Sequence, residues 1–364
     1  MSKLKCYFYH DWFNYQHISK SFVNIPKEIS KLDINVEAKI GYFGPKKFCE
    51  RDSQLVCLGS GFIYKYKLIR VLKVICDFLF NRVDIIMLLH ISRETVLLAL
   101  VYKIFFPRKK IYLKLDIDTT FFDYSPSNIA LFCIERLLKS CSIISYESRL
   151  IEDKLRNSTL FSSSINKLIY LPNCMPRMEQ VIPEPSKKEK IIITVGRLGT
   201  FQKNTEIVIE ALNGLDLNGW RFIFIGSATE SVKAKINELE KTNTAVEYVG
   251  EVISREEMIE WYKKSSVFLL SSRYEGFATV LVEAAAYGNF IISTNVNGAR
   301  DVTRNFDFGA LVNSSNEIKD TLSDIVSGRM DIDERSRSMQ RFVIERFNWP
   351  AAIVDSRLLE MIKS

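Results

Sequence analysis

The stretch that decides the fold is SSRYEGFATVLVEAAAYG, residues 271–288. An apolar run, SVFLLSS, leads into it from Ser266 and predicts a buried strand. Phe277 to Tyr287 then predicts a helix, rich in Ala, with Gly288 as its C-cap glycine. The start of such a helix presents backbone N–H groups and a partial positive charge. This strand–turn–helix unit therefore suits an anion, typically a phosphate.

Two carboxylates flank that helix start. Glu275 lies in the turn before it, and Glu283 lies about 9 Å further along, roughly two helical turns. They could hold hydroxyl groups on either side of a diphosphate. The alternative is a glutamate before a helix and another on its exposed face, which chance supplies often.

The pattern Glu-Gly-Phe, with a second Glu eight residues after the first, resembles the signature of the retaining family-4 glycosyltransferases. The resemblance implies two Rossmann-like domains of the GT-B type and a nucleotide-diphospho-sugar donor. It assigns Glu275 to the donor sugar and Glu283 to the ribose. It also places the diphosphate against the turn and helix start, Gly276, Phe277, Ala278 and Thr279.

Further matches to the family run in order through residues 190–350. The loop after ITVGRL carries Arg197 and Lys203, which in the family clasp the donor diphosphate. Arg offers a fork of donors to phosphate oxygens and Lys a compact charge, although two solvated loop cations would give the same sequence. The segment VEYVGEVIS resembles the family's strand–Gly–loop, whose backbone near Val252 meets the base.

The rest of the chain predicts an α/β protein with two doubly wound domains and a cleft between them. Short apolar runs alternate with helical stretches in both halves, as in parallel sheets covered on two faces. We expect an N-terminal acceptor-binding domain at 1–175, a linker at 176–189 and a nucleotide-sugar-binding domain at 190–345. The ending, 346–364, resembles the family's last helix, which crosses back to the first domain.

Candidate acceptor-side residues lie at strand ends of the first half, where open α/β sheets bind ligands. Many family members place a histidine where this chain has Asp116, and His90 ends the preceding strand. Either could instead be structural, His90 in the core and Asp116 capping a turn. His10 is a weaker candidate, and we expect His17 to be a solvated loop residue.

Charge is distributed unevenly along the chain. Residues 1–180 hold 27 Lys and Arg against 17 Asp and Glu, whereas residues 181–364 hold 23 against 26. Residues 62–82 and 101–110 mix cations with apolar side chains, which fits either an anionic membrane surface or an ordinary helix with a cationic face. No nucleic-acid motif is present, so we expect no nucleic-acid partner.

Seven cysteines without a Cys-x-x-Cys pair predict reduced thiols, and no apolar run is long enough to span a bilayer. Asp116 and Asp118 form an Asp-x-Asp triplet, the metal-binding pattern of single-domain (GT-A) glycosyltransferases, but so short a motif occurs often by chance. We expect no metal and no cofactor.

The resemblance implies a cytoplasmic enzyme of the hexosyltransferase type, often peripheral on the inner membrane face. It would move a sugar to a glycan or lipid-linked acceptor in cell-surface polysaccharide biosynthesis. Two alternatives stay open: a nucleotide-sugar epimerase of the same fold, which needs no acceptor, and an inactive scaffold subunit.

Overall fold

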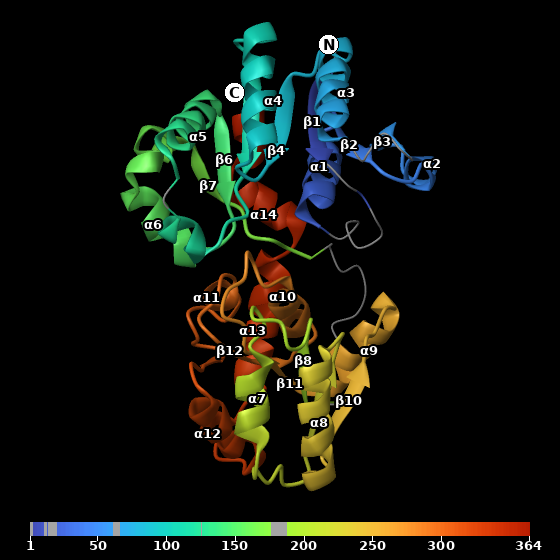
Figure 1. Cartoon of the computed structure of the whole chain (residues 1–364), viewed down its shortest axis with the longest axis vertical. Helices are drawn as coiled ribbons and strands as arrows, with labels where there is room; N and C mark the ends of the chain where they lie inside the picture. Colours follow the sequence, from blue (N-terminus) through green and yellow to red (C-terminus); the bar gives the residue numbers. More distant parts are fainter. Residues whose placement is uncertain (1–2, 11–12, 14–19, 61–65, 125, 176–187) are drawn as a thin grey trace. The chain divides into compact units, whose positions relative to one another are not determined.

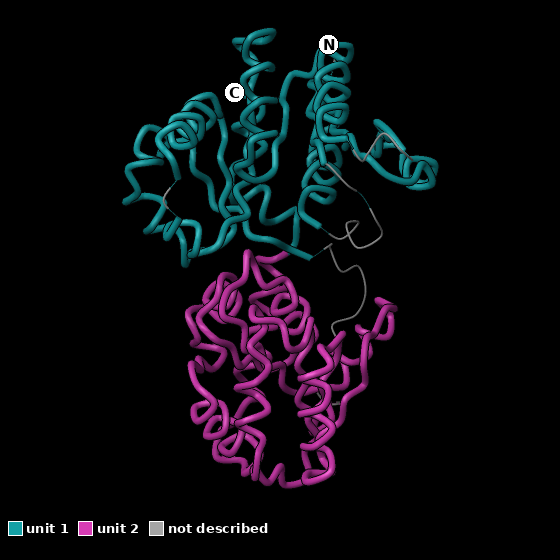
Figure 2. The backbone as a smooth tube through the Cα atoms, in the orientation of Figure 1, with its two compact units in different colours: residues 1–177, 348–364 teal, residues 178–347 magenta. Residues whose placement is uncertain are grey.

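The computed structural model describes residues 3–10, 13, 20–60, 66–124, 126–175 and 188–364. The chain divides into two compact units, residues 1–177 with 348–364 and residues 178–347 (Figure 2). His17, the first residues of the cationic segment 62–82, and nearly all of the predicted linker 176–189 lie outside the described residues.

The first unit is built on a seven-stranded parallel sheet in the order β3-β2-β1-β4-β5-β6-β7 (Figure 1). Its strands coincide with the apolar runs of the first half, whose buried side chains need cover on both faces of the sheet. They are β1 (Leu4–His10), β2 (Val36–Phe43), β3 (Leu55–Gly59), β4 (Ile85–Leu89), β5 (Lys110–Lys114), β6 (Ile143–Tyr146) and β7 (Leu168–Tyr170).

Helices cover both faces of this sheet. The connections β3–α3–β4, β4–α4–β5 and β5–α5–β6 run in the same direction along the sheet. Because such crossovers are right-handed, the three helices share one face. α1 and α14 pack together as part of the other layer. The helices are α1 (Ser21–Leu32), α2 (Lys47–Arg51), α3 (Lys67–Phe80), α4 (Arg93–Phe105), α5 (Asn128–Ser140), α6 (Glu152–Asn157), α14 (Trp349–Asp355) and α15 (Leu358–Lys363).

The second unit has a six-stranded parallel sheet in the order β10-β9-β8-β11-β12-β13. Its strands are β8 (Glu189–Val195), β9 (Arg221–Ile225), β10 (Val246–Gly250), β11 (Ser265–Leu270), β12 (Phe290–Ser293) and β13 (Ala310–Leu311). Its helices are α7 (Thr205–Leu212), α8 (Glu230–Thr242), α9 (Arg255–Lys264), α10 (Thr279–Ala286), α11 (Ala299–Val302), α12 (Ser315–Val326) and α13 (Asp333–Arg346). Both units therefore have the doubly wound parallel sheet predicted from the sequence.

The end of the chain differs from the single helix that the sequence suggested. It forms two short helices, α14 and α15, because Arg357 between them takes a left-handed backbone with φ of 60°. Residues 348–364 belong to the first unit. There Lys110 Nζ donates to the carbonyl oxygen of Met361 at 3.0 Å, which ties α15 to the start of β5.

Each sheet has one switch point, where the strand order reverses: β1/β4 in the first unit and β8/β11 in the second. Loops leave the carboxyl ends of two neighbouring strands in opposite directions there, which opens room for a ligand. Among the described residues, the helices are too short or too polar to cross a bilayer.

Candidate functional site

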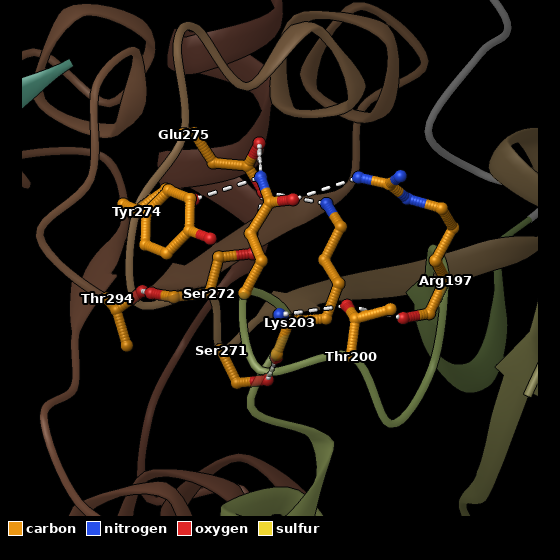
Figure 3. A network of polar contacts seen from close by, with 9 residues as sticks. Arg197, Thr200, Lys203, Ser271, Ser272, Tyr274, Glu275 and Thr294 are labelled. Carbon is orange, nitrogen blue, oxygen red and sulfur yellow. Dashed lines mark hydrogen bonds and ion pairs between the residues drawn. The ribbon is translucent and has the colours of Figure 1, made fainter. Parts of the chain in front are cut away.

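The decisive stretch lies at the switch point of the second unit. Arg197 and Lys203 belong to the loop after β8, and Ser272 and Glu275 to the turn after β11, the neighbouring strand. The predicted cations and the first predicted carboxylate thus meet at one edge of one sheet (Figure 3).

Lys203 and Glu275 form an ion pair, with Nζ 2.7 Å from Oε1 and side chains only 14% and 11% exposed. Ser272 Oγ donates to the same carboxylate oxygen at 2.7 Å. The stem of Lys203 lies on Gly196, where an added Cβ would come within 3.0 Å of Lys203 Cε. The glycine at the end of β8 therefore leaves room for the lysine to reach Glu275.

Gln202 connects the second cation to this pair. Its Oε1 accepts from Arg197 Nη2 at 2.9 Å, and its Nε2 donates to Glu275 Oε2 at 3.1 Å. Arg197, Gln202, Glu275 and Lys203 thus form one connected polar network. Sequence reasoning missed Gln202, although its place in the loop next to Lys203 was a usable signal.

The start of α10 corrects one expectation. The sequence predicted a helix from Phe277 with free N–H groups, but the helix begins at Thr279. The N–H of Ala278 donates to the carbonyl oxygen of Asn297 at 3.0 Å, and that of Thr279 donates to the carbonyl oxygen of Phe277 at 2.9 Å. Two of the expected donors are therefore already engaged, one by the β12–α11 loop and one within the turn itself. Gly288 ends the helix with φ of 77°, as predicted.

Glu283 lies further along α10, between two side chains from the neighbouring α9 region. Tyr262 Oη donates to its Oε2 at 3.3 Å, and Arg255 Nη1 lies 3.6 Å from its Oε1. Burial, reinforced by the negative charge of Glu283, holds the pKa of Tyr262 well above its usual value, so this hydroxyl stays a donor. Val252 lies partly exposed in the loop between β10 and α9.

In the first unit, His90 and Asp116 come together at the ends of neighbouring strands. His90 Nε2 lies 3.8 Å from Asp116 Oδ2, while Nδ1 lies 3.3 Å from the carbonyl oxygen of Leu115 and donates to it. Both residues take left-handed backbone conformations, with φ of 59° and 47°. Such conformations are uncommon for residues with a Cβ and occur where surrounding structure enforces them.

A buried ion pair, Lys114 with Glu147, and the backbone of its lysine hold these two residues through hydrogen bonds. Lys114 Nζ and Glu147 Oε1 are in contact, and both side chains are fully buried. The other oxygen of Glu147 accepts the N–H of Asp116 at 2.9 Å, and the carbonyl oxygen of Lys114 accepts the N–H of His90 at 2.9 Å. Burial raises the pKa of Glu147 to about 7, against the lowering effect of Lys114. The sequence marked neither residue, because a Lys and a Glu at the ends of two strands predict solvated groups.

A pocket of about 230 Å³ opens at the β1/β4 switch point of this unit. His90 and His10 line it together with the start of α4 and part of α3, including Ser92, Glu94 and Arg70. The ring of His10 stacks on Phe22 with centroids 3.9 Å apart, so it is held by an aromatic neighbour.

Asp118 has a different, structural role. Its Oδ1 accepts from the backbone N–H and the hydroxyl of Thr120, at 2.8 and 2.5 Å, and so caps the short 3-10 helix Thr119–Asp123. Among the described residues, His, Cys, Asp and Glu form no group of three or more that could hold a metal ion.

Comparison with known proteins matches the second unit to a family model described as "Glycosyl transferases group 1", over residues 178–341. The amylovoran biosynthesis glycosyltransferase AmsD of Erwinia amylovora is 22% identical over 208 residues, covering 57% of each chain. A Campylobacter jejuni protein, GalNAc-alpha-(1->4)-GalNAc-alpha-(1->3)-diNAcBac-PP-undecaprenol alpha-1,4-N-acetyl-D-galactosaminyltransferase, is 30% identical over 138 residues, covering 36% of each chain. The chain spans about half the length, or less, of the curated relatives that it matches.

Among solved structures, HepE from Anabaena in complex with UDP and glucose superimposes with a TM-score of 0.69. The match covers 99% of both chains at 15% identity. An identity so low shows the fold alone, which is the predicted pair of Rossmann-like domains of the GT-B type. The match of residues 178–341 to the group 1 glycosyltransferases agrees with the family resemblance expected from the sequence.

Proposed function

We propose that this protein is a retaining glycosyltransferase, moving a sugar from a nucleotide-diphospho-sugar to a glycan or lipid-linked acceptor in cell-surface polysaccharide biosynthesis. The observation that carries the proposal is the network of Arg197, Lys203 and Glu275 at the β8/β11 switch point. Two cations and a carboxylate, brought together from the loops after two neighbouring strands, suit a diphosphate with a sugar beside it.

In this proposal, Lys203 and Arg197 contact the donor diphosphate and offset the charge that develops on it as the sugar leaves. Lys203 is held by Glu275 before the donor arrives, so on binding the lysine exchanges one negative partner, the carboxylate, for another, the phosphate. Glu275 is then available to accept hydrogen bonds from sugar hydroxyls. The turn and helix start, Gly276 to Thr279, border the diphosphate.

Glu283 would hold the ribose hydroxyls, with Tyr262 and Arg255 keeping its carboxylate in place. The backbone near Val252 would meet the base. In the first unit, His90 and Asp116 would contact the acceptor hydroxyl at the carboxyl ends of β4 and β5. The departing phosphate takes the proton of that hydroxyl, so no separate carboxylate base is required.

The relatives support both the donor and the acceptor class. The HepE structure holds UDP and glucose, and the Campylobacter protein is named for an undecaprenol-linked acceptor. We extend these classes to this chain as part of the proposal, with the reaction on the cytoplasmic side of a membrane.

The test begins with a thermal-shift screen of UDP-, GDP-, dTDP- and ADP-sugars, since a ligand that binds only the folded state raises its stability. The donor that shifts the melting temperature is then incubated with and without polyprenyl-diphosphate-linked glycans. We expect nucleotide release that depends on the acceptor, and a product with the anomeric configuration of the donor.

The outcomes separate the alternatives. Conversion of the donor to an isomeric nucleotide-sugar without acceptor would indicate an epimerase. Donor binding without turnover across the acceptor panel would indicate a scaffold subunit. Product of inverted configuration would overturn the retaining mechanism while leaving glycosyl transfer in place.

A further inference from the structure

Gln202 is an uncharged side chain that lies between an arginine and a glutamate at the β8/β11 switch point. Its Oε1 accepts from Arg197 Nη2 at 2.9 Å. Its Nε2 donates to Glu275 Oε2 at 3.1 Å and to the carbonyl oxygen of Tyr274 at 3.2 Å. One amide therefore uses its acceptor on a cation and its donors on two oxygens of the neighbouring turn.

The neighbours of this amide fix its orientation. A guanidinium can only donate hydrogen bonds, whereas a carboxylate and a backbone carbonyl can only accept them. If the amide were rotated by 180°, its NH₂ group would face Arg197 and its oxygen would face Glu275 and Tyr274, so all three bonds would be lost. A residue that connects a cation to a carboxylate in this way needs an acceptor and a donor, and glutamine has both.

The backbone around Gln202 is held against the turn after β11, so the side chain starts from a fixed point. The carbonyl oxygen of Gln202 accepts the N–H of Arg273 at 2.8 Å. The carbonyl oxygen of Lys203 accepts from Ser271 Oγ at 2.8 Å, and that of Phe201 accepts from the guanidinium of Arg273. Three consecutive residues of the loop are thus bonded to the turn.

Arg197 depends on Gln202 for its orientation. The arginine is exposed, and within the described part of the chain its bond to Gln202 is the only polar contact of its guanidinium. A long, exposed side chain loses rotamer freedom when it binds a ligand, and a partner that already holds it reduces that cost. The bond uses one N–H group, which leaves the other donors of the guanidinium for phosphate oxygens.

Glu275 keeps Gln202 as a partner when its lysine leaves. Its Oε1 contacts Lys203 and Ser272, and its Oε2 contacts Gln202. In the proposed reaction Lys203 turns to the donor diphosphate, which removes one of these contacts. Ser272 and Gln202 then still hold one carboxylate oxygen each, so the carboxylate stays aligned for the sugar.

We propose that Gln202 is a positioning residue for glycosyl transfer, which holds the diphosphate-binding Arg197 and the sugar-binding Glu275 at a fixed separation. It acts through these two side chains and does not touch the reacting atoms. The inference rests on the proposed function, because both partners receive their roles there. It adds a residue whose task is to align two groups that act in the same step.

The experiment begins with Gln202→Met, which keeps the length of the side chain and removes its hydrogen bonds. The probe is the nucleotide-sugar selected by the thermal-shift screen, with the acceptor that gives turnover. We expect kcat to fall about tenfold or more, because misaligned groups slow the reaction. The donor Kd should change less than about threefold, because Lys203 and Glu283 keep their contacts and the loss falls mainly on the transition state.

Two further variants sharpen this comparison. Gln202→Glu keeps an acceptor for Arg197 but places a second carboxylate against Glu275, so its kcat should be at least as low. It also replaces Gln202→Met in the comparison if that variant does not fold, which circular dichroism verifies. Gln54→Met is the matched control, a half-buried glutamine of the first unit that donates to a backbone carbonyl oxygen, and it should keep wild-type kcat.

Double-mutant cycles separate positioning from a role in loop stability alone. With Arg197→Ala or Glu275→Ala present, one of the two partners of Gln202 is gone. Gln202→Met should then lower kcat by only about threefold or less, because interacting residues are not additive. A residue that only stabilises the loop would lower kcat by the same factor in every background.

The outcomes distinguish this inference from the proposed function. Wild-type kcat in Gln202→Met, or the same loss in all three backgrounds, would overturn the inference and leave the proposed function in place. A wild-type protein that neither binds nor turns over any nucleotide-sugar would overturn the proposed function, and the inference with it, before any variant is compared.

Discussion

Two lysine–glutamate pairs lie at the carboxyl ends of the two sheets and differ in burial and in the partners of the glutamate. Lys114 and Glu147 in the first unit are fully buried, whereas Lys203 and Glu275 in the second are 14% and 11% exposed. Glu147 divides its two oxygens between Lys114 and the N–H of Asp116. Glu275 divides its own among side chains only, namely Lys203, Ser272 and Gln202.

We propose that this difference separates a structural pair from one that can receive a ligand. A pair without access to solvent cannot exchange its partners, and it fixes the left-handed backbone at Asp116. A pair at the sheet edge, held by side chains that can rotate, can exchange the protein carboxylate for a phosphate. Burial and the type of partner, rather than the identity of the pair, therefore predict its role.

Breaking the buried pair should have the largest effect. Lys114→Met leaves Glu147 buried and uncompensated, and loss of one partner of such a pair typically costs about 3–5 kcal/mol. Chemical unfolding followed by circular dichroism measures it. Lys203→Met is the matched variant at the exposed pair, and we expect it to lose clearly less stability. Equal losses would contradict the distinction drawn between the two pairs.

The loss of folding stability in Lys114→Met should also depend on pH. Burial raises the folded-state pKa of Glu147 to about 7, above the unfolded value of 4.5, and removal of Lys114 raises it further. The folded variant then binds a proton that the unfolded chain releases. Both proteins lose stability as pH rises from 4.5 towards 7, but above about pH 7 the wild-type carboxyl is already ionised and only the variant continues to lose stability. The gap to wild type should therefore stay nearly constant up to about pH 7 and widen above it, and a gap that does not widen above pH 7 would contradict this account.

The Lys203–Glu275 pair and its neighbour Arg197 should instead affect turnover. In the proposed reaction, Lys203→Ala or Arg197→Ala would remove charge that stabilises the leaving diphosphate, and loss of one such donor typically lowers kcat by about 10²–10³-fold. Lys233→Ala, an exposed lysine of α8, is the control and should keep wild-type kcat. Wild-type kcat in both site variants would remove these residues from the reaction.

Sequence reasoning recovered the fold because each strand is a short apolar run between turns. The resemblance to the family brought Arg197, Lys203 and Glu275 into one hypothesis, and the convergence of strand ends in parallel sheets led to His90 and Asp116. Sequence reasoning missed what depends on burial: no pattern distinguishes Lys114, which is fully buried, from a solvated lysine. It also predicted free N–H groups at the start of α10. That prediction failed at Ala278, whose N–H donates to the carbonyl oxygen of Asn297, because this is a tertiary contact that the local sequence does not reveal.

Substitutions of the two glutamates in residues 271–288 should affect different steps, one the rate of reaction and the other the binding of the donor. Glu275→Gln should mainly lower kcat, since its carboxylate contacts Lys203 and lies where the donor sugar would react. Glu283→Ala should mainly weaken donor binding by about tenfold, because a ribose contact changes little during the reaction. Calorimetry gives the donor Kd, and steady-state assays give kcat. Equal effects of both variants on both quantities would argue against the assigned division.

The smallest expected effect is that of Asp118→Ala and of chelation. Asp116 and Asp118 form the Asp-x-Asp triplet of metal-dependent, single-domain glycosyltransferases, but this chain has two parallel sheets. One carboxylate oxygen of Asp118 caps the short helix Thr119–Asp123. In the proposed reaction, Arg197 and Lys203 would supply the positive charge that a metal would bring to a diphosphate. We expect kcat to change less than about twofold in Asp118→Ala, in EDTA, and on addition of Mn²⁺ or Mg²⁺, against the 10²-fold loss predicted for Lys203→Ala. Activity that disappears with EDTA, returns with Mn²⁺ and is absent in Asp118→Ala would show that a metal in the first unit neutralises the diphosphate. The first unit, and not the Lys203–Glu275 pair of the second, would then supply the positive charge for the reaction.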